Sequence, residues 1–247
     1  MSKKVTAIYF SPTGNTKKCI EAMAAAIDKD FVSIDLSYPG TEVPTTPFGK
    51  DEIVLLGGPV YGGRIPKAAM ARFEGIKAEG AKCILVASYG NRHYDDALLE
   101  LEDFATQRGF TVTGGAAPIG RHTFGHIQVE RPDENDLAQC REFALKAAQN
   151  GPCSMPGNRP MKDGGNAGSF RPLTSDSCVG CGLCKRSCPM GAIGEDNCAV
   201  GEGCISCFRC IRICPVGAKN MNTEAYNSFA EGFSQKLSAR RENEFFL

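Results

Sequence analysis

Several features are scarce or absent in this chain, and each absence narrows the class of protein. There is no tryptophan, there are three histidines, and 28 Lys and Arg balance 28 Asp and Glu to a net charge of zero. A balanced charge gives no electrostatic case for binding nucleic acid. No apolar run approaches the length of a membrane span. Met1-Ser-Lys-Lys precedes a short strand-like run instead of a signal-peptide core, so we expect a cytoplasmic protein.

Two nucleotide signatures are missing as well. No Gly-x-Gly-x-x-Gly follows a predicted strand, and the N-terminal loop Ser11–Thr16 has no lysine at the Walker position. We therefore expect neither direct use of NAD(P)H nor binding of a nucleoside triphosphate. No dedicated catalytic constellation stands out, so the sequence leaves the catalytic residues unassigned.

Cysteine, by contrast, is abundant and clustered. Nine of the 13 cysteines lie between Cys178 and Cys214. They form C-V-G-C-G-L-C-K-R-S-C-P, which begins at Cys178, and C-I-S-C-F-R-C-I-R-I-C-P, which begins 26 residues later at Cys204. Each run is C-x2-C-x2-C-x3-C-P, the bacterial pattern for cubane iron–sulfur clusters. The repeat predicts two [4Fe-4S] clusters.

The same pattern predicts which cysteines share a cluster. Three closely spaced thiolates bind one cluster, and the fourth, before proline, binds the other. The predicted ligand sets are Cys178, Cys181, Cys184 and Cys214 for the first cluster, and Cys204, Cys207, Cys210 and Cys188 for the second. The repeat does not fit a zinc site, because zinc sites usually pair two C-x2-C units across a longer spacer. It does not fit a disulfide framework either, because such a framework needs a secreted chain. Cys198 falls outside the pattern, and we expect a loop thiol there.

Basic residues lie between the cluster ligands, and two interpretations of them stay open. They are Lys185, Arg186, Arg209 and Arg212. They either offset the charge of the clusters or are ordinary solvated cations.

The first 150 residues alternate strand and helix signals. Strands are predicted at 5–10, 31–36, 52–57, 81–88 and 110–113 continued by 116–119, where 31–36 alternates apolar and polar residues and 52–57 and 81–88 are continuous apolar runs. Helical spacing predicts helices at 17–27, 95–107 and 133–149. Continuous apolar runs are typical of parallel strands buried on both faces. The alternation predicts an α/β fold with a doubly wound, five-stranded parallel sheet. In such sheets a ligand binds at the carboxyl ends of the strands.

Three loops at that edge suggest a flat, phosphorylated ligand. Hydroxyls and a glycine in Ser11–Thr16 directly precede a helix, so backbone N–H groups there can bind a phosphate. The alternative is a plain helix N-cap by Thr13 or Asn15. The other two loops, 57–66 and 88–96, are rich in glycine and contain tyrosine. A ring-shaped ligand needs aromatic faces and backbone amides, so we expect Tyr61 and Tyr94 to stack on it.

Residues 4–150 resemble a flavodoxin, a family whose cofactor is FMN and whose strand order is 2-1-3-4-5. Ser11–Thr16 matches the family's phosphate loop, Gly58–Gly62 one flavin loop, and Tyr89–Tyr94 the second. The resemblance implies FMN contacts from Ser11, Thr13, Gly14, Asn15, Thr16, Pro59, Val60, Tyr61, Gly62, Ser88, Tyr89, Gly90, Asn91, Arg92, Tyr94 and Asp95.

The segment from about Asp176 to Ala218 resembles a two-cluster bacterial ferredoxin, a small α+β domain. The whole chain is similar to the EFR1 family of ferrodoxin-type flavoproteins, also in Gly120–His126 and Glu130–Asp133. The expected parts are a flavodoxin-like domain at 1–150, a linker at 151–172, a ferredoxin-like domain at 173–222 and a helical tail at 223–247.

These features predict an iron–sulfur flavoprotein oxidoreductase that transfers electrons between two [4Fe-4S] clusters and FMN, with a small-molecule acceptor. The alternative is a carrier that relays electrons between protein partners, such as a ferredoxin, and has no substrate. A deep pocket over the flavin would favour the enzyme, and an exposed flavin edge the carrier. The roles of His93, His122 and His126, which lie in loops at the cofactor edge, stay open.

Overall fold

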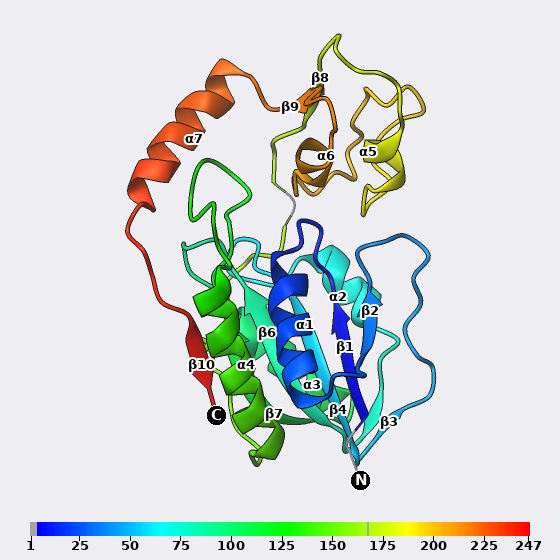
Figure 1. Ribbon diagram of the computed structural model, residues 1–247, viewed down its shortest axis with the longest axis vertical. Coiled ribbons are helices and arrows are strands. Elements are labelled where there is room, and N and C mark those ends of the chain that lie inside the picture. The colour runs from blue at the N-terminus through cyan, green and yellow to red at the C-terminus, as the bar shows by residue number, and fades with distance from the viewer. Residues whose placement is uncertain (1–3, 167) are drawn as a thin grey trace.

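The computed structural model describes residues 4–166 and 168–247. Its centre is a parallel sheet with helices on both faces (Figure 1). The parallel strands run in the order β2-β1-β4-β6-β7, with bounds Val32–Asp35, Lys4–Tyr9, Glu52–Pro59, Lys82–Ser88 and Thr111–Ala117. Counted along the chain this is the order 2-1-3-4-5 of flavodoxin-like folds. The predicted fold class is confirmed.

Strands β1, β4, β6 and β7 are buried on both faces, which explains their apolar residues, whereas the edge strand β2 is partly exposed. Val5, Ala7 and Tyr9 of β1 belong to one core cluster, and Ile8 belongs to the other. One cluster is covered by α1 (Asn15–Ile27) and α4 (Glu134–Gln149), the other by α2 (Lys67–Phe73) and α3 (Ala97–Gln107). Helix α2 was not predicted, because seven residues are too few to show a helical period.

The C-terminal tail differs from the prediction of a helix through to the end. Helix α7 spans Glu224–Lys236, and the chain then forms β10, Glu244–Phe246, which pairs antiparallel with β7. The Phe245 ring stacks on Phe143 of α4 at 5.0 Å between centroids. Without β10, the β7 edge would present unpaired backbone groups to solvent. The sheet therefore has six strands, and it is completed only by the last residues of the chain.

The cysteine-rich part lies above the carboxyl ends of the parallel strands in Figure 1. It contains two one-turn helices, α5 (Leu183–Arg186) and α6 (Arg209–Arg212), and an antiparallel pair, β8 (Leu173–Thr174) and β9 (Lys219–Asn220). A further two-stranded pair, β3 (Phe48–Gly49) with β5 (Ala78–Glu79), lies outside the main sheet. No helix within the described ranges is long and apolar enough to cross a membrane.

The segment between the two parts is fixed to α3 and its N-terminus. Both the Asn158 and the Lys162 backbone N–H groups donate to the Asp96 carboxylate, each at 2.8 Å. Met155 is buried in the core cluster beneath α2 and α3. Because of these contacts, the segment lies along the flavodoxin-like part and reaches the carboxyl edge of the sheet.

Candidate functional site

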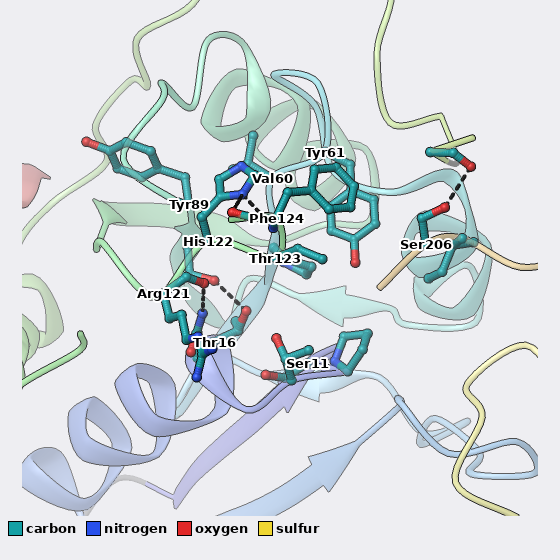
Figure 2. Close-up of a pocket in the computed structure, with 18 of the residues that line it drawn as sticks. Ser11, Thr16, Val60, Tyr61, Tyr89, Arg121, His122, Thr123, Phe124 and Ser206 are labelled. Carbon is teal, nitrogen blue, oxygen red and sulfur yellow. Dashed lines mark hydrogen bonds between the residues drawn. The ribbon is translucent and has the colours of Figure 1, made fainter. Parts of the chain in front are cut away.

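A cavity of about 300 Å³ lies at the carboxyl edge of the sheet (Figure 2). All three loops singled out in the sequence line it. From the predicted set it takes Ser11, Thr13, Asn15, Thr16, Pro59, Val60, Tyr61, Gly62, Ser88, Tyr89 and Gly90. Tertiary structure therefore brings together three loops that are separate in sequence.

The loop before α1 leaves the start of that helix open. Gly14 is the N-cap residue with φ of +90°, and as a glycine it has no side chain to bond to the first turn. The alternative of a plain N-cap by Thr13 or Asn15 is therefore wrong. Lys17 N–H donates to Ser11 Oγ at 3.0 Å, which folds the loop back on the first turn. The other N–H groups at the start of the helix are suited to binding an anion.

Two hydroxyls expected to contact the cofactor, of which Thr16 belongs to the phosphate loop, also hold the loops together. Thr16 Oγ1 and Ser88 Oγ are buried and lie 2.6 Å apart, and either can be the donor. This bond joins α1 to the end of β6. Each hydroxyl has one proton, so the bond uses one and leaves the other for a ligand.

Tyr61 is the tyrosine whose ring lies at the cavity, whereas the Tyr89 ring points away (Figure 2). Tyr61 N–H donates to Arg64 O at 2.8 Å in a tight turn after β4. Burial raises the pKa of Tyr61, and the nearby Cys207 thiol adds to the shift. The Tyr89 ring packs edge-on against Tyr94 at 5.5 Å. Tyr61 is therefore the aromatic face available to a planar ligand, and Tyr89 contributes backbone.

Tyr94 does not lie at the cavity, in contrast to the stacking role expected for it. Its hydroxyl donates to the Glu244 carboxylate at 2.8 Å, and its ring meets Phe246 at 6.3 Å. His93 stacks on the same ring at 4.8 Å. Strand β10 therefore occupies the side of Tyr94 that a ligand would need.

Other residues of the third loop also form hydrogen bonds with the C-terminal tail. Asn91 Nδ2 donates to Leu237 O at 2.9 Å and to Ala239 O at 2.7 Å. Arg92 pairs with Asp95. The structure thus places Asn91, Arg92, Tyr94 and Asp95 outside the cavity lining. Asn91 and Tyr94 bind the C-terminal tail, and the Arg92 carbonyl oxygen accepts from Arg241. Asp95 pairs instead with Arg92 and with Lys162 of the connecting segment.

Several lining residues were not predicted as cofactor contacts. Four of them follow β7, two come from the linker and two from the second cysteine run: Arg121, His122, Thr123, Phe124, Asn166, Gly168, Ile205 and Ser206. The sequence offered one indication that residues 121–124 could line the cavity, because they follow the last predicted strand. Nothing in the sequence pattern indicates that Ile205 and Ser206 line a cavity, because they lie between two cysteines that are predicted cluster ligands.

His122 lines the cavity as a neutral imidazole. His122 Nδ1 lies 2.9 Å from the Phe124 backbone nitrogen and 3.1 Å from the Phe124 carbonyl oxygen. Burial lowers the pKa of His122 to about 4. The ring meets Phe233 of α7 edge-on at 5.0 Å. His126 lies apart from this cavity, on the rim of a second one.

Two arginines of the second cysteine run bind the flavodoxin-like part directly. One Arg209 guanidinium nitrogen donates to Pro12 O at 2.7 Å and the other to the Tyr38 hydroxyl at 2.6 Å. Arg212 donates to His122 O at 3.0 Å. The interpretation of Arg209 and Arg212 as solvated cations is therefore wrong. Both fix the cysteine run to the loops around the cavity.

The cysteines fall into two groups in space, and the groups cross the sequence runs. Cys178, Cys181 and Cys184 line one small pocket together with Cys214 from the second run. Backbone N–H groups, first that of Lys219, lower the pKa of Cys214, which favours a thiolate.

The second group gathers around Cys210. Burial, together with the neighbouring thiols of Cys207, Cys204 and Cys188, raises the pKa of this thiol to about 12. Cys188, from the first run, thus lies close to thiols of the second run. Cys198 is exposed in the connecting loop. Among the described residues, no three His, Cys, Asp or Glu side chains converge on a point that would suit a single metal ion.

Two short segments match family profiles described as 4Fe-4S binding domain, residues 173–194 and 204–218. Solved structures similar to this chain include a flavodoxin from the domain Archaea, with 19% identity, coverage of 59% of this chain and 96% of that chain, and a TM-score of 0.44. Oxidised Flavodoxin 2 from Bacillus cereus has 20% identity, 59% and 98% coverage and a TM-score of 0.45.

Rubredoxin oxygen:oxidoreductase from Desulfovibrio gigas is similar over 60% of this chain and 35% of that chain, with 16% identity and a TM-score of 0.42. No curated protein matches the sequence. The strand order and the two profile matches together describe a chain in which a flavodoxin-like sheet is followed by segments of the 4Fe-4S binding type.

Proposed function

We propose that the chain is an iron–sulfur flavoprotein oxidoreductase that transfers electrons between two [4Fe-4S] clusters and FMN. One observation carries the proposal. The cavity formed by the phosphate-type loop and the two glycine-rich loops is also lined by Ile205 and Ser206, between Cys204 and Cys207. The second cysteine run therefore forms part of the wall of the proposed flavin site.

The residues at the cavity are suited to FMN. The open start of α1 offers N–H groups to a phosphate, and Ser11 and Thr13 lie in the same loop. Tyr61 offers an aromatic face, and Gly62 and Gly90 leave backbone within reach of a planar ring. When bound, flavin exchanges one or two electrons and each cluster exchanges one. The combination supports placing the chain in the EFR1 family of ferrodoxin-type flavoproteins.

The cysteine groups supply the proposed ligand sets. The inner set is Cys188, Cys204, Cys207 and Cys210, and the outer set is Cys178, Cys181, Cys184 and Cys214. Cys207 packs in the same core cluster as Ile205, against Tyr61. In the outer group Cys181 is exposed. The chain thus holds one ligand set against the flavin cavity and the other toward solvent.

An exposed apolar surface around the outer set supports a protein partner. Val179 is 65% exposed and Val216 is 46% exposed, and both lie next to outer ligands. A redox protein such as a ferredoxin would exchange electrons there, which is also what the carrier alternative requires. We keep the proposed parts 1–150, 151–172, 173–222 and 223–247, with β10 completing the sheet of the first. Thiolate ligands favour the reducing cytoplasm.

Anaerobically purified protein is expected to contain about eight irons and about one FMN per chain. Two cubane clusters and one flavin cavity give these amounts. Iron and acid-labile sulfide analysis, with chromatography of the acid-released flavin, measures both. FAD in place of FMN, or about one iron per cysteine run, would contradict the proposal.

Gly14→Val is expected to weaken FMN binding about tenfold while leaving the iron content unchanged. The φ of +90° strains any residue with a Cβ, although space is open around the site. Thr13→Ala removes a hydroxyl that can donate to a phosphate, and a hydrogen bond to a charged group is worth about 1.5–3 kcal/mol. Fluorescence titration of deflavinated protein with FMN gives both constants.

Gly40→Val is the matched control. Gly40 has φ of +84°, also with open space, and it lies in an exposed loop outside the cavity lining. It carries the same kind of strain without touching the helix start. Equal FMN affinity for Gly14→Val and Gly40→Val would place the phosphate elsewhere.

A further inference from the structure

A second cavity, of about 610 Å³, adjoins the proposed flavin cavity. The two share Arg121 and Thr123 in their walls. The loop after β7 forms one side, and α6 with β9 forms another. Helix α7 closes the third side, where the Ser234 hydroxyl accepts from His126 N–H at 3.0 Å and the Tyr226 hydroxyl accepts from Gly125 N–H at 3.3 Å.

Two cations in this wall lack an acidic partner. The Arg121 side chain makes no hydrogen bond or ion pair with any residue of 4–166 or 168–247, and Arg212 donates only to the His122 carbonyl oxygen. Both guanidinium-bearing side chains line the same cavity. Two like charges beside one cavity leave a place that an anion would stabilise.

The remaining lining defines the size and charge of that anion. Glu231 also lines the cavity, so with Arg121 and Arg212 the formal charge is one positive. Phe208, Met221 and other apolar side chains form part of the wall, next to amides such as Gln235. This combination is suited to a molecule with one negative charge and an apolar body.

We propose that the second cavity binds a small organic monocarboxylic acid, with its carboxylate on Arg121 and Arg212 and its apolar body against Phe208 and Met221. A planar guanidinium pairs with a carboxylate through two parallel hydrogen bonds, and a single carboxylate balances the charge of the site. The inference rests on the proposed function, since it names the class of small molecule that would lie beside the flavin. It favours the enzyme over the carrier.

The test uses full-length protein loaded with clusters and FMN, with iron and flavin measured in every sample. Crotonate, benzoate and cinnamate are titrated calorimetrically, together with cinnamamide as the uncharged analogue and inorganic phosphate as the competing anion. We expect at least one acid to bind and cinnamamide to bind at least about tenfold more weakly. Arg121→Gln is expected to weaken binding of that acid about ten- to hundredfold, because it removes a charged hydrogen-bond donor.

Two further variants separate the cavity from general charge effects. Ala230→Phe adds a ring to the α7 wall and is expected to block acid binding without altering charge. Arg141→Gln removes the same charge from α4, outside the cavity, and is expected to bind the acid like the wild type.

The inference is overturned if none of the three acids binds, if Arg121→Gln and Ala230→Phe bind as tightly as wild type, or if phosphate binds more tightly than every acid. These outcomes in samples that contain flavin and both clusters leave the proposed function standing. Samples without FMN or iron contradict the proposed function instead.

Discussion

Replacing Cys188 with serine is expected to remove the cluster bound mainly by the second cysteine run, although Cys188 belongs to the first. Its thiol lies with those of Cys207 and Cys204 around Cys210. Cys184, one helical turn earlier, instead lines the pocket of the other group. Loss of one cubane would lower the iron content from about eight to about four per chain.

Electron paramagnetic resonance of the reduced protein distinguishes the two clusters. Cys188→Ser and Cys207→Ser are expected to leave the same residual signal, and Cys184→Ser and Cys214→Ser the other one. Each variant controls for the others, because all four exchange one sulfur for oxygen. If Cys188→Ser leaves the signal that Cys184→Ser leaves, the ligands do not cross between the runs.

The same variants report on the route to the flavin cavity. Because Cys207 packs beside Tyr61, loss of the inner group should slow reduction of the flavin by reduced ferredoxin, while dithionite, which needs no docking, should still act quickly. Stopped-flow bleaching of flavin absorbance compares the variants.

Asp136→Ala is expected to destabilise the protein by about 3–5 kcal/mol, the usual result of leaving one charge of a buried pair alone. Arg131 Nε donates to the Asp136 carboxylate at 2.8 Å, and the two side chains are 2% and 0% exposed. The melting temperature should fall by roughly 10 °C. Differential scanning fluorimetry of the loaded protein measures the shift.

The pair also fixes the C-terminal tail. Asn243 Nδ2 donates to Asp136 at 2.9 Å, and Arg131 donates to Arg241 O at 2.7 Å. Asp136→Ala should therefore also expose β10 to limited proteolysis. Glu134→Ala, in the same turn of α4, is the control, since its ion pair with Arg141 is at the surface and should change stability by less than about 1 kcal/mol.

The stability gap between wild type and Asp136→Ala should depend on pH. Burial opposes ionisation of Asp136, but the hydrogen bonds from Arg131 and others outweigh it and hold its pKa below the ordinary value. A carboxylate with a lowered folded pKa stabilises the protein above its unfolded pKa of about 3.9 and loses that effect as the pH falls through the folded value. The gap should be complete near neutral pH and narrow below about pH 4. A gap that is unchanged in acid would show that the carboxylate's charge is not the cause.

Some features of this protein follow from the sequence alone, because neighbouring residues determine them. Continuous apolar runs were enough to predict the central parallel strands, and the alternation of apolar and polar residues was enough to predict the edge strand at 31–36. The crossed ligand sets were predicted from the bacterial cysteine pattern, in which the fourth cysteine, before proline, binds the other cluster. The position of Tyr61 at the cavity could also be predicted, because Tyr61 comes two residues after the end of a parallel strand.

Other features depend on segments that meet only in the folded chain. Tyr94 and Asn91 carry the residue types of a flavin loop, yet they bind Glu244 and Leu237, because the β7 edge needs a pairing strand and the tail supplies it. Arg209 donates to the carbonyl oxygen of Pro12, which lies almost two hundred residues earlier in the chain. Spacing along a chain fixes which groups are near each other locally. Which residues wall a cavity is decided by packing between distant segments, and no local pattern records it.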